Sequence, residues 1–154
     1  MSFQLPITPK PRVGGLVAGH ASAGGGVELP VFYPATGAQI STLIEDDAGA
    51  VDQAVQAARR AFDTGPWPSL DLTARVEALE ACRSAILANI DELARLECAA
   101  TGLVLKELRA RHMVRAAYNF RFFAEHISQS AGQVYTQSEN YVTTVTRVPV
   151  GVAA

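Results

Sequence analysis

The chain has 154 residues, of which 49% are hydrophobic and 18% charged, and its formal net charge is −2. This length suits a single domain able to bury a core, and the near-neutral charge gives no electrostatic basis for binding nucleic acid or an anionic membrane. No apolar run approaches the roughly 20 residues that span a bilayer, and the N-terminus lacks the apolar stretch of a signal peptide, so we expect a cytoplasmic protein.

Strands and turns are predicted for the beginning of the chain. The expected strands are 13–17, 31–33 and 39–44. The last two form a hairpin, because Pro34 sets φ early in the connecting turn and Gly37 can take the positive φ that closes it. The glycine-rich loop at 21–26 leads into a strand and not into a helix, which indicates a surface linker and not a phosphate cradle.

Four amphipathic helices are predicted next, because apolar residues recur at intervals of three and four. They cover about 48–64, 72–89, the stretch between Asp91 and Gly102, and 104–130. Asp46 or Asp47 is expected to cap the first helix, Asp71 the second and Asp91 the third. Gly102 is expected to end the third helix.

A β-ribbon is predicted after the helices, with antiparallel strands at 134–135 and 141–148. A two-stranded ribbon is marginally stable alone, and its open edges invite another chain. The apolar residues at 149–154 are typical of the start of a buried strand. We therefore expect the chain to be the leading part of a larger enzyme.

The charged fraction of 18% is low against the roughly 25% of ordinary soluble domains. It suggests that another domain or subunit covers much of the surface; the alternative is an alanine-rich helical protein. Cys82 and Cys98 fall inside helical patterns with no Cys-x-x-Cys or Cys/His spacing, which predicts buried free thiols. The histidines are too far apart in the sequence to indicate a metal site.

One group of side chains could carry chemistry. Arg115 and Asn119 are four residues apart, so they share a helix face, which continues to Phe122 and Phe123. A guanidinium beside amide and aromatic groups can hold a carboxylate through two parallel hydrogen bonds. The alternative is a solvated arginine whose stem lies over apolar neighbours.

Several motifs, in this order, resemble the N-terminal portion of the aldehyde dehydrogenase superfamily. They are Tyr33-Pro-Ala-Thr-Gly37, the helix from Val51 to Phe62, Ala100-Thr-Gly102 and Arg147-Val-Pro149-Val-Gly-Val152. Tyr33 departs from the usual Asn, and Leu103-Val104 from the usual Lys-Pro. The resemblance implies an α/β fold of β-hairpins, about four amphipathic helices and a bridging β-ribbon. Its expected parts are strands and helices at 1–132 that flank the nucleotide-binding domain, an oligomerisation ribbon at 133–148 and the start of the first nucleotide-binding strand at 149–154.

The resemblance also implies oxidation of an aldehyde to a carboxylic acid with NAD or NADP. The family's nucleophile, base and cofactor residues lie beyond this segment, so we assign no catalytic, cofactor or metal residue and expect residues 1–154 alone to be inactive and free of cofactor. The stretch around Arg115 resembles dehydrogenases of muconate-type semialdehydes, such as the 5-carboxymethyl-2-hydroxymuconate enzyme. In these an arginine matching Arg115 lines the substrate entrance, with Arg111 the weaker alternative.

The expected partners are the remainder of the dehydrogenase chain and further copies of it, joined through the ribbon at 133–148. The alternative function is non-catalytic: a helical interaction module, or a truncated gene product that docks on an intact relative.

Overall fold

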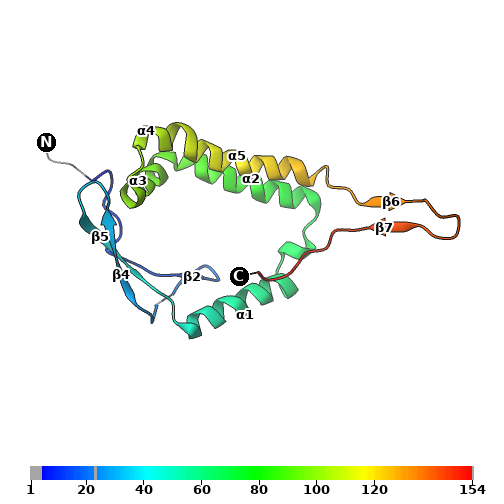
Figure 1. The fold of residues 1–154 in the computed structure, drawn as a ribbon, viewed down its shortest axis with the longest axis horizontal. Helices are drawn as coiled ribbons and strands as arrows, with labels where there is room; N and C mark the ends of the chain where they lie inside the picture. The colour runs from blue at the N-terminus through cyan, green and yellow to red at the C-terminus, as the bar shows by residue number, and fades with distance from the viewer. Residues whose placement is uncertain (1–4, 23, 154) are drawn as a thin grey trace.

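The computed structural model describes residues 5–22 and 24–153. Two small sheets near the N-terminus are followed by helices and then by a β-ribbon that projects away from them (Figure 1). The antiparallel helices α2 and α5 lie side by side, while α1 lies apart from them across the molecule. The expected α/β arrangement, with hairpins, helices and a bridging ribbon, is confirmed.

The first sheet has the order β1-β5-β4. Its strands are β1 (Arg12–Val13), β4 (Glu28–Tyr33) and β5 (Ala38–Ile44). β4 and β5 form the expected hairpin, with a register shift at Val31/Phe32, and β1 runs parallel to β5. Gly37 closes the turn at φ 69°, as predicted.

The expected single strand at 13–17 is wrong. β1 ends at Val13, and β2 (Leu16–Val17) pairs instead with β3 (His20–Ala21) in a separate hairpin. The chain changes sheets at the intervening glycines, where Asp46 lies so close to Gly15 that a Cβ there would be 2.0 Å from Oδ2 of Asp46. β3 also extends into the expected loop at 21–26, of which residue 23 lies outside the described residues.

The helical region contains α1 (Ala48–Thr64), η1 (Trp67–Ser69), α2 (Leu72–Ala88), α3 (Ile90–Thr101), α4 (Leu105–Glu107), the π-turn η2 (Leu108–His112) and α5 (Met113–Ile127). Asp47 and Asp71 cap α1 and α2, each accepting a 2.8 Å hydrogen bond from the backbone N–H three residues later. Gly102 ends α3 in the left-handed region at φ 73°. These three helix-end predictions are confirmed.

The predicted cap of α3 is wrong, whereas the long fourth helix is confirmed with shorter ends and a π-turn within it. Asn89, and not Asp91, is the N-cap of α3; Asp91 lies in the first turn, where its carboxylate pairs with Arg95 and Arg109. The helix expected at 104–130 is helical from Leu105 to Ile127 and is interrupted by the π-turn.

The ribbon consists of β6 (Gln133–Tyr135) and β7 (Thr143–Val145), which pair antiparallel as predicted. The second strand is shorter than the expected 141–148. Both strands are exposed along their whole length, since the ribbon projects beyond the helices (Figure 1).

The core is small and rich in alanine. The buried apolar residues of the described chain are Tyr33, Ala94, Ala99, Leu108, Ala117 and Ala124. Alanine lets helix backbones approach closely, which suits the packing of α5 on α2 and α3. By contrast, α1 buries none of its residues, and Val51 and Val55 of its apolar stripe are exposed.

Cys82 is exposed and Cys98 is half-buried, and both are free. The prediction of a buried thiol is therefore wrong for Cys82, because the apolar stripe of α2 that contains it is only partly covered. Within residues 5–22 and 24–153, no helix is both long enough and apolar enough to cross a bilayer.

Candidate functional site

A surface depression of about 550 Å³ lies over η2 and the first turns of α5. Its lining residues are Arg111, His112, Val114, Arg115 and Tyr118. Two of the three residues proposed from the sequence, Arg111 and Arg115, therefore open into the same space. Asn119, the third, is exposed on the following turn and is not part of this lining.

The π-turn determines which side chains face this depression. An α-helix turns by about 100° per residue, which would place Leu108 about 140° away from Met113 around the helix. Here the N–H of Met113 donates to the carbonyl of Leu108, five residues earlier, and the wider turn brings the two side chains toward the same side. Leu108 is thereby buried, with 1% of its surface exposed.

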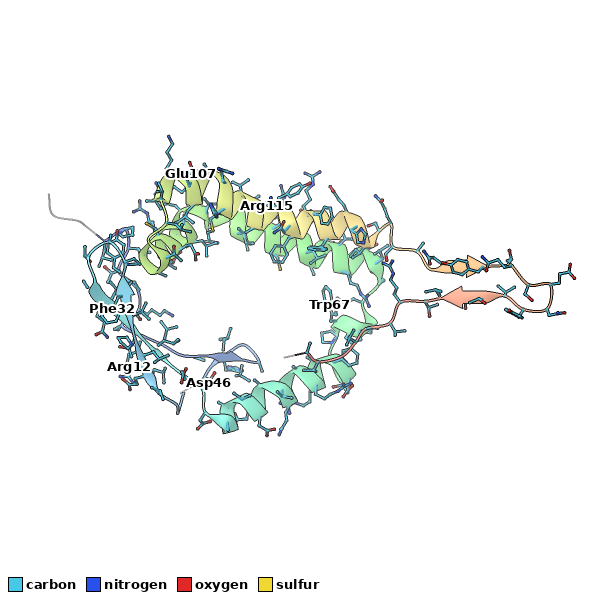
Figure 2. The ribbon with its side chains drawn as sticks, in the orientation of Figure 1. Arg12, Phe32, Asp46, Trp67, Glu107 and Arg115 are labelled. Carbon is cyan, nitrogen blue, oxygen red and sulfur yellow. The ribbon has the colours of Figure 1, made fainter. Side chains whose placement is uncertain are left out.

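The same wide turn aligns the two arginines. Residues four apart in an α-helix are offset by about 40°, and the smaller rotation per residue within a π-turn reduces this offset. Arg111 and Arg115 are both exposed and line the same depression, whereas Leu108 is buried. Figure 2 shows Glu107 and Arg115 on this helical segment.

The arginines of this segment differ in their partners. Arg109 pairs with Asp91 of α3, and Arg121 donates from Nε to Glu125 at 2.8 Å. Arg111 has only a long contact of 3.4 Å from Nη1 to Oε2 of Glu107, and its side chain is 79% exposed. Among the residues that the structure describes, Arg115 forms no ion pair with any carboxylate.

Asp91 connects this segment to α3. Its carboxylate accepts a 2.7 Å hydrogen bond from Nε of Arg95 and also pairs with Arg109. The hydrogen bond from Arg95 and the positive charge of Arg109 lower the pKa of Asp91 below its ordinary value of 3.8. The carboxylate therefore stays charged at neutral pH and holds η2 against the beginning of α3.

An aromatic cluster continues the helix face beyond the depression. The rings of Phe122 and Phe123 meet edge to face with centroids 5.3 Å apart. The ring of Phe122 also stacks on His126 at 6.2 Å. Phe122 and Phe123 follow Arg115 and Asn119 along α5, but neither phenylalanine lines the depression.

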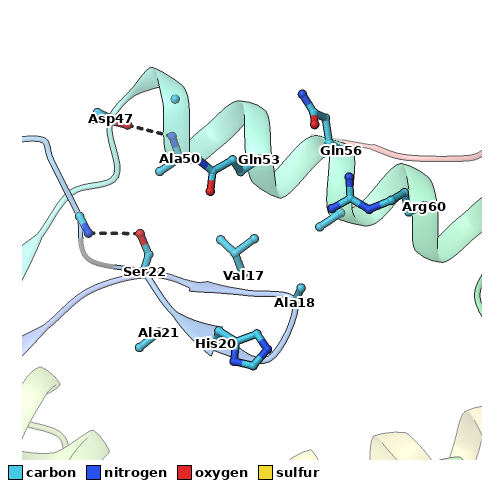
Figure 3. A pocket seen from close by; sticks show the side chains of 13 residues that line it. Val17, Ala18, His20, Ala21, Ser22, Asp47, Ala50, Gln53, Gln56 and Arg60 are labelled. Atoms are coloured by element: carbon cyan, nitrogen blue, oxygen red, sulfur yellow. Dashed lines mark hydrogen bonds between the residues drawn. The ribbon is translucent and has the colours of Figure 1, made fainter.

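A second cavity, of about 590 Å³, lies between the β2–β3 hairpin and α1. Figure 3 shows Gln53 extending from α1 toward the hairpin and Val17 extending from the hairpin toward α1. His20 and Arg60 also belong to its lining. No motif in the sequence predicts this cavity, because its two walls come from segments that are far apart along the chain.

The described residues do not assemble a metal centre. His20 and His112 lie in different cavities. In the part of the chain that the structure describes, no group of three or more His, Cys, Asp or Glu side chains is placed to hold a metal ion.

Known proteins resemble the chain in sequence. The profile of the aldehyde dehydrogenase family matches residues 21–154. Aldehyde dehydrogenase 1 of Tanacetum cinerariifolium is 36% identical over 127 residues, which cover 82% of this chain and 26% of that protein. The 5-carboxymethyl-2-hydroxymuconate semialdehyde dehydrogenase of Escherichia coli is 31% identical over 121 residues, covering 79% of this chain and 25% of the relative. The chain thus spans about a quarter of the length of these relatives.

Solved structures of aldehyde dehydrogenases resemble the chain in fold. An indole-3-acetaldehyde dehydrogenase of P. syringae superposes with a TM-score of 0.81 at 26% identity, covering 88% of this chain and 28% of that protein. The NAD+ complex of an aldehyde dehydrogenase from Bacillus cereus superposes with a TM-score of 0.77 at 25% identity, covering 84% and 26%. Sequence and fold agree, and the chain belongs to the aldehyde dehydrogenase family, of which it matches the N-terminal part of the fold.

Proposed function

We propose that the chain is the N-terminal segment of an NAD(P)-dependent dehydrogenase that oxidises a carboxylated semialdehyde, such as a product of aromatic ring cleavage, to the acid. Its membership of the family supports the reaction class. The similarity to a muconate-type semialdehyde dehydrogenase supports the substrate class. A structural relative bound to NAD+ supports the cofactor.

In this proposal the segment contributes substrate recognition and assembly, and the catalytic and cofactor residues lie in the remainder of the enzyme. The glycine run ending at Gly26 leads to β4 and does not open a helix, so it lacks the helix N-terminus that favours phosphate binding. We therefore derive no chemical step from this segment and expect no NADH formation by residues 1–154 alone. The exposed ribbon of β6 and β7 is the proposed contact between copies of the enzyme.

One observation carries the substrate assignment: the guanidinium of Arg115 opens into a depression and forms no ion pair with a carboxylate of the described chain. Such a group can donate two parallel hydrogen bonds to a substrate carboxylate. The carboxylate would be held at Arg115 while the aldehyde end reaches the reacting centre of the complete enzyme.

The test is steady-state kinetics of Arg115→Gln in the complete dehydrogenase. Losing a hydrogen bond between charged groups costs on the order of 2–3 kcal/mol, so we expect kcat/KM for a carboxylated semialdehyde to fall by about 30- to 150-fold. An uncharged aldehyde of similar length should be little affected. Equal losses for both substrates would instead indicate that Arg115 acts through packing.

A further inference from the structure

We propose that Arg59 of α1 is a positioning residue that fixes the chain at Gly151, and that this contact is needed for tight binding of the dinucleotide by the complete enzyme. The inference rests on the proposed function and on the expectation that residues 149–154 begin the first strand of the nucleotide-binding domain. Arg59 itself would touch neither the cofactor nor the aldehyde, and would act through the backbone of that strand.

The first argument is the path of the chain after the ribbon. Residues 146–153 return from the ribbon to α1 (Figure 1). The side chains of Val148 and Val150 are 78% and 98% exposed, whereas Gly151 and Val152 are half-buried. The chain is therefore covered again only where it reaches α1.

The second argument is the contact at Gly151. A Cβ built on this residue would lie 3.6 Å from Nη1 of Arg59, which is an ordinary contact distance. Among the described residues, no other atom outside the adjacent residues comes within 4 Å of that Cβ. Gly151 has φ 112°, a conformation that other residues rarely adopt. The guanidinium thus lies against the backbone where the direction of the chain depends on a glycine.

The third argument is the way in which Arg59 is held. Its Nε donates to Oδ2 of Asp63 at 2.8 Å and its Nη2 pairs with Oδ1, so one carboxylate engages two of the three nitrogens. The guanidinium also lies over the ring of Phe62, with Cζ 4.7 Å from the ring centroid. The third nitrogen, Nη1, is the one beside Gly151, and no hydrogen bond joins it to the described residues. A fixed guanidinium therefore keeps one donor free for the chain that passes it.

The consequence for cofactor binding follows from the cost of ordering a mobile segment. A binding site holds its ligand well only when its backbone is kept within about 0.5 Å of the productive geometry. If the start of the strand can move, binding of the dinucleotide has to order it, and this cost lowers the affinity. Holding the chain at Gly151 before the cofactor arrives removes that cost.

The experiment measures the Kd of NAD+ and of NADP+ for the complete dehydrogenase by quenching of protein fluorescence, and KM for an aldehyde at saturating dinucleotide. The variants are Arg59→Gln, Arg59→Lys, Gly151→Ala and the double variant Arg59→Gln/Gly151→Ala. The matched control is Arg60→Gln, whose arginine is the next residue of α1 but lines the cavity beside the β2–β3 hairpin. Urea unfolding and particle size verify that each variant keeps its fold.

We expect Arg59→Gln to raise Kd for the preferred dinucleotide by about 3- to 10-fold, the effect of losing one hydrogen bond, and to leave KM for the aldehyde unchanged. Arg59→Lys keeps the charge but not the planar fork, so it should recover part of the loss. The double variant should raise Kd by less than the product of the two single effects, because both changes disturb one contact. Arg60→Gln should leave Kd unchanged.

The possible failures are distinguishable. If Arg59→Gln leaves Kd unchanged, or raises Kd and KM for the aldehyde equally, this inference is overturned and the proposed function stands. Independent, multiplicative effects of Arg59→Gln and Gly151→Ala would overturn it as well; if Gly151→Ala does not fold, the comparison of Arg59→Gln and Arg59→Lys with Arg60→Gln decides. If the wild-type enzyme binds neither NAD+ nor NADP+, the proposed function fails and this inference fails with it.

Discussion

Replacing Gly102 with alanine tests how the end of α3 is joined to the β4–β5 turn. Gly102 has φ 73°, and a Cβ built on it would lie 3.1 Å from Cβ of Pro34. A side chain in the left-handed region costs about 1–2 kcal/mol, of which roughly 0.4–1 kcal/mol is offset because alanine restricts the unfolded chain. Crowding against Pro34 adds to this cost, although both residues are exposed and the proline ring can give way in part.

We therefore expect Gly102→Ala to lower the free energy of unfolding by about 1–2 kcal/mol. The matched control is Gly37→Ala. Gly37 has φ 69°, but a Cβ there would meet nothing within 4 Å, so only the backbone cost of about 0.5–1 kcal/mol remains.

Both variants are measured in the complete protein by urea unfolding, with hydrogen exchange of the amides in the last turn of α3 as a local readout. Faster exchange at the Gly102 amide, which donates to the carbonyl of Cys98 at 2.9 Å, should accompany the larger loss. Equal losses for the two variants would refute the idea that contact with Pro34 contributes to stability.

Two further predictions concern the helical segment that carries the depression. Leu108→Ala should lower the free energy of unfolding by about 2–5 kcal/mol because it leaves a cavity beneath the π-turn. The control Leu103→Ala, at a residue 46% exposed, should lower it by about 0.5 kcal/mol or less in the same urea titration. Similar losses for the two variants would show that Leu108 does not anchor the turn. Asp91→Asn should lower the free energy of unfolding at neutral pH. It should also make that free energy depend less on pH in the acid range. The pKa of Asp91 is lowered below 3.8 in the folded state by Arg95 and Arg109. The contribution of its carboxylate to the free energy of unfolding is therefore present above that pH and is lost as the pH falls further. An unchanged pH profile of unfolding in the variant would contradict this.

Local signals in the sequence were sufficient for several features. The turn at Pro34 and Gly37, the caps Asp47 and Asp71, and the helix end at Gly102 all depend on residues within three or four positions of one another. The order of such motifs was also sufficient to identify the family. Each of these signals reflects a backbone preference that acts before any tertiary contact forms.

The cap of α3 shows where local reasoning fails. Asp91 is a good capping residue by type, and Asn89 makes no side-chain capping hydrogen bond. The carboxylate of Asp91 is nevertheless used by Arg95 and by Arg109, which arrives from a segment 18 residues away. Asp91 thus lies inside the first turn with two arginine partners, although short-range propensity assigns it to the helix end.

The sequence by itself determined the family, the number and order of the main helices and the candidate arginines Arg111 and Arg115. Only the tertiary structure decided that the helix widens at Leu108–His112, that both arginines open into one depression and that Asn119 lies outside it. The physical reason is that Leu108 is buried where this segment packs on α3, and its side chain has to fit there. No pattern of spacing within the helix carries that requirement, because it comes from the helix against which this segment packs.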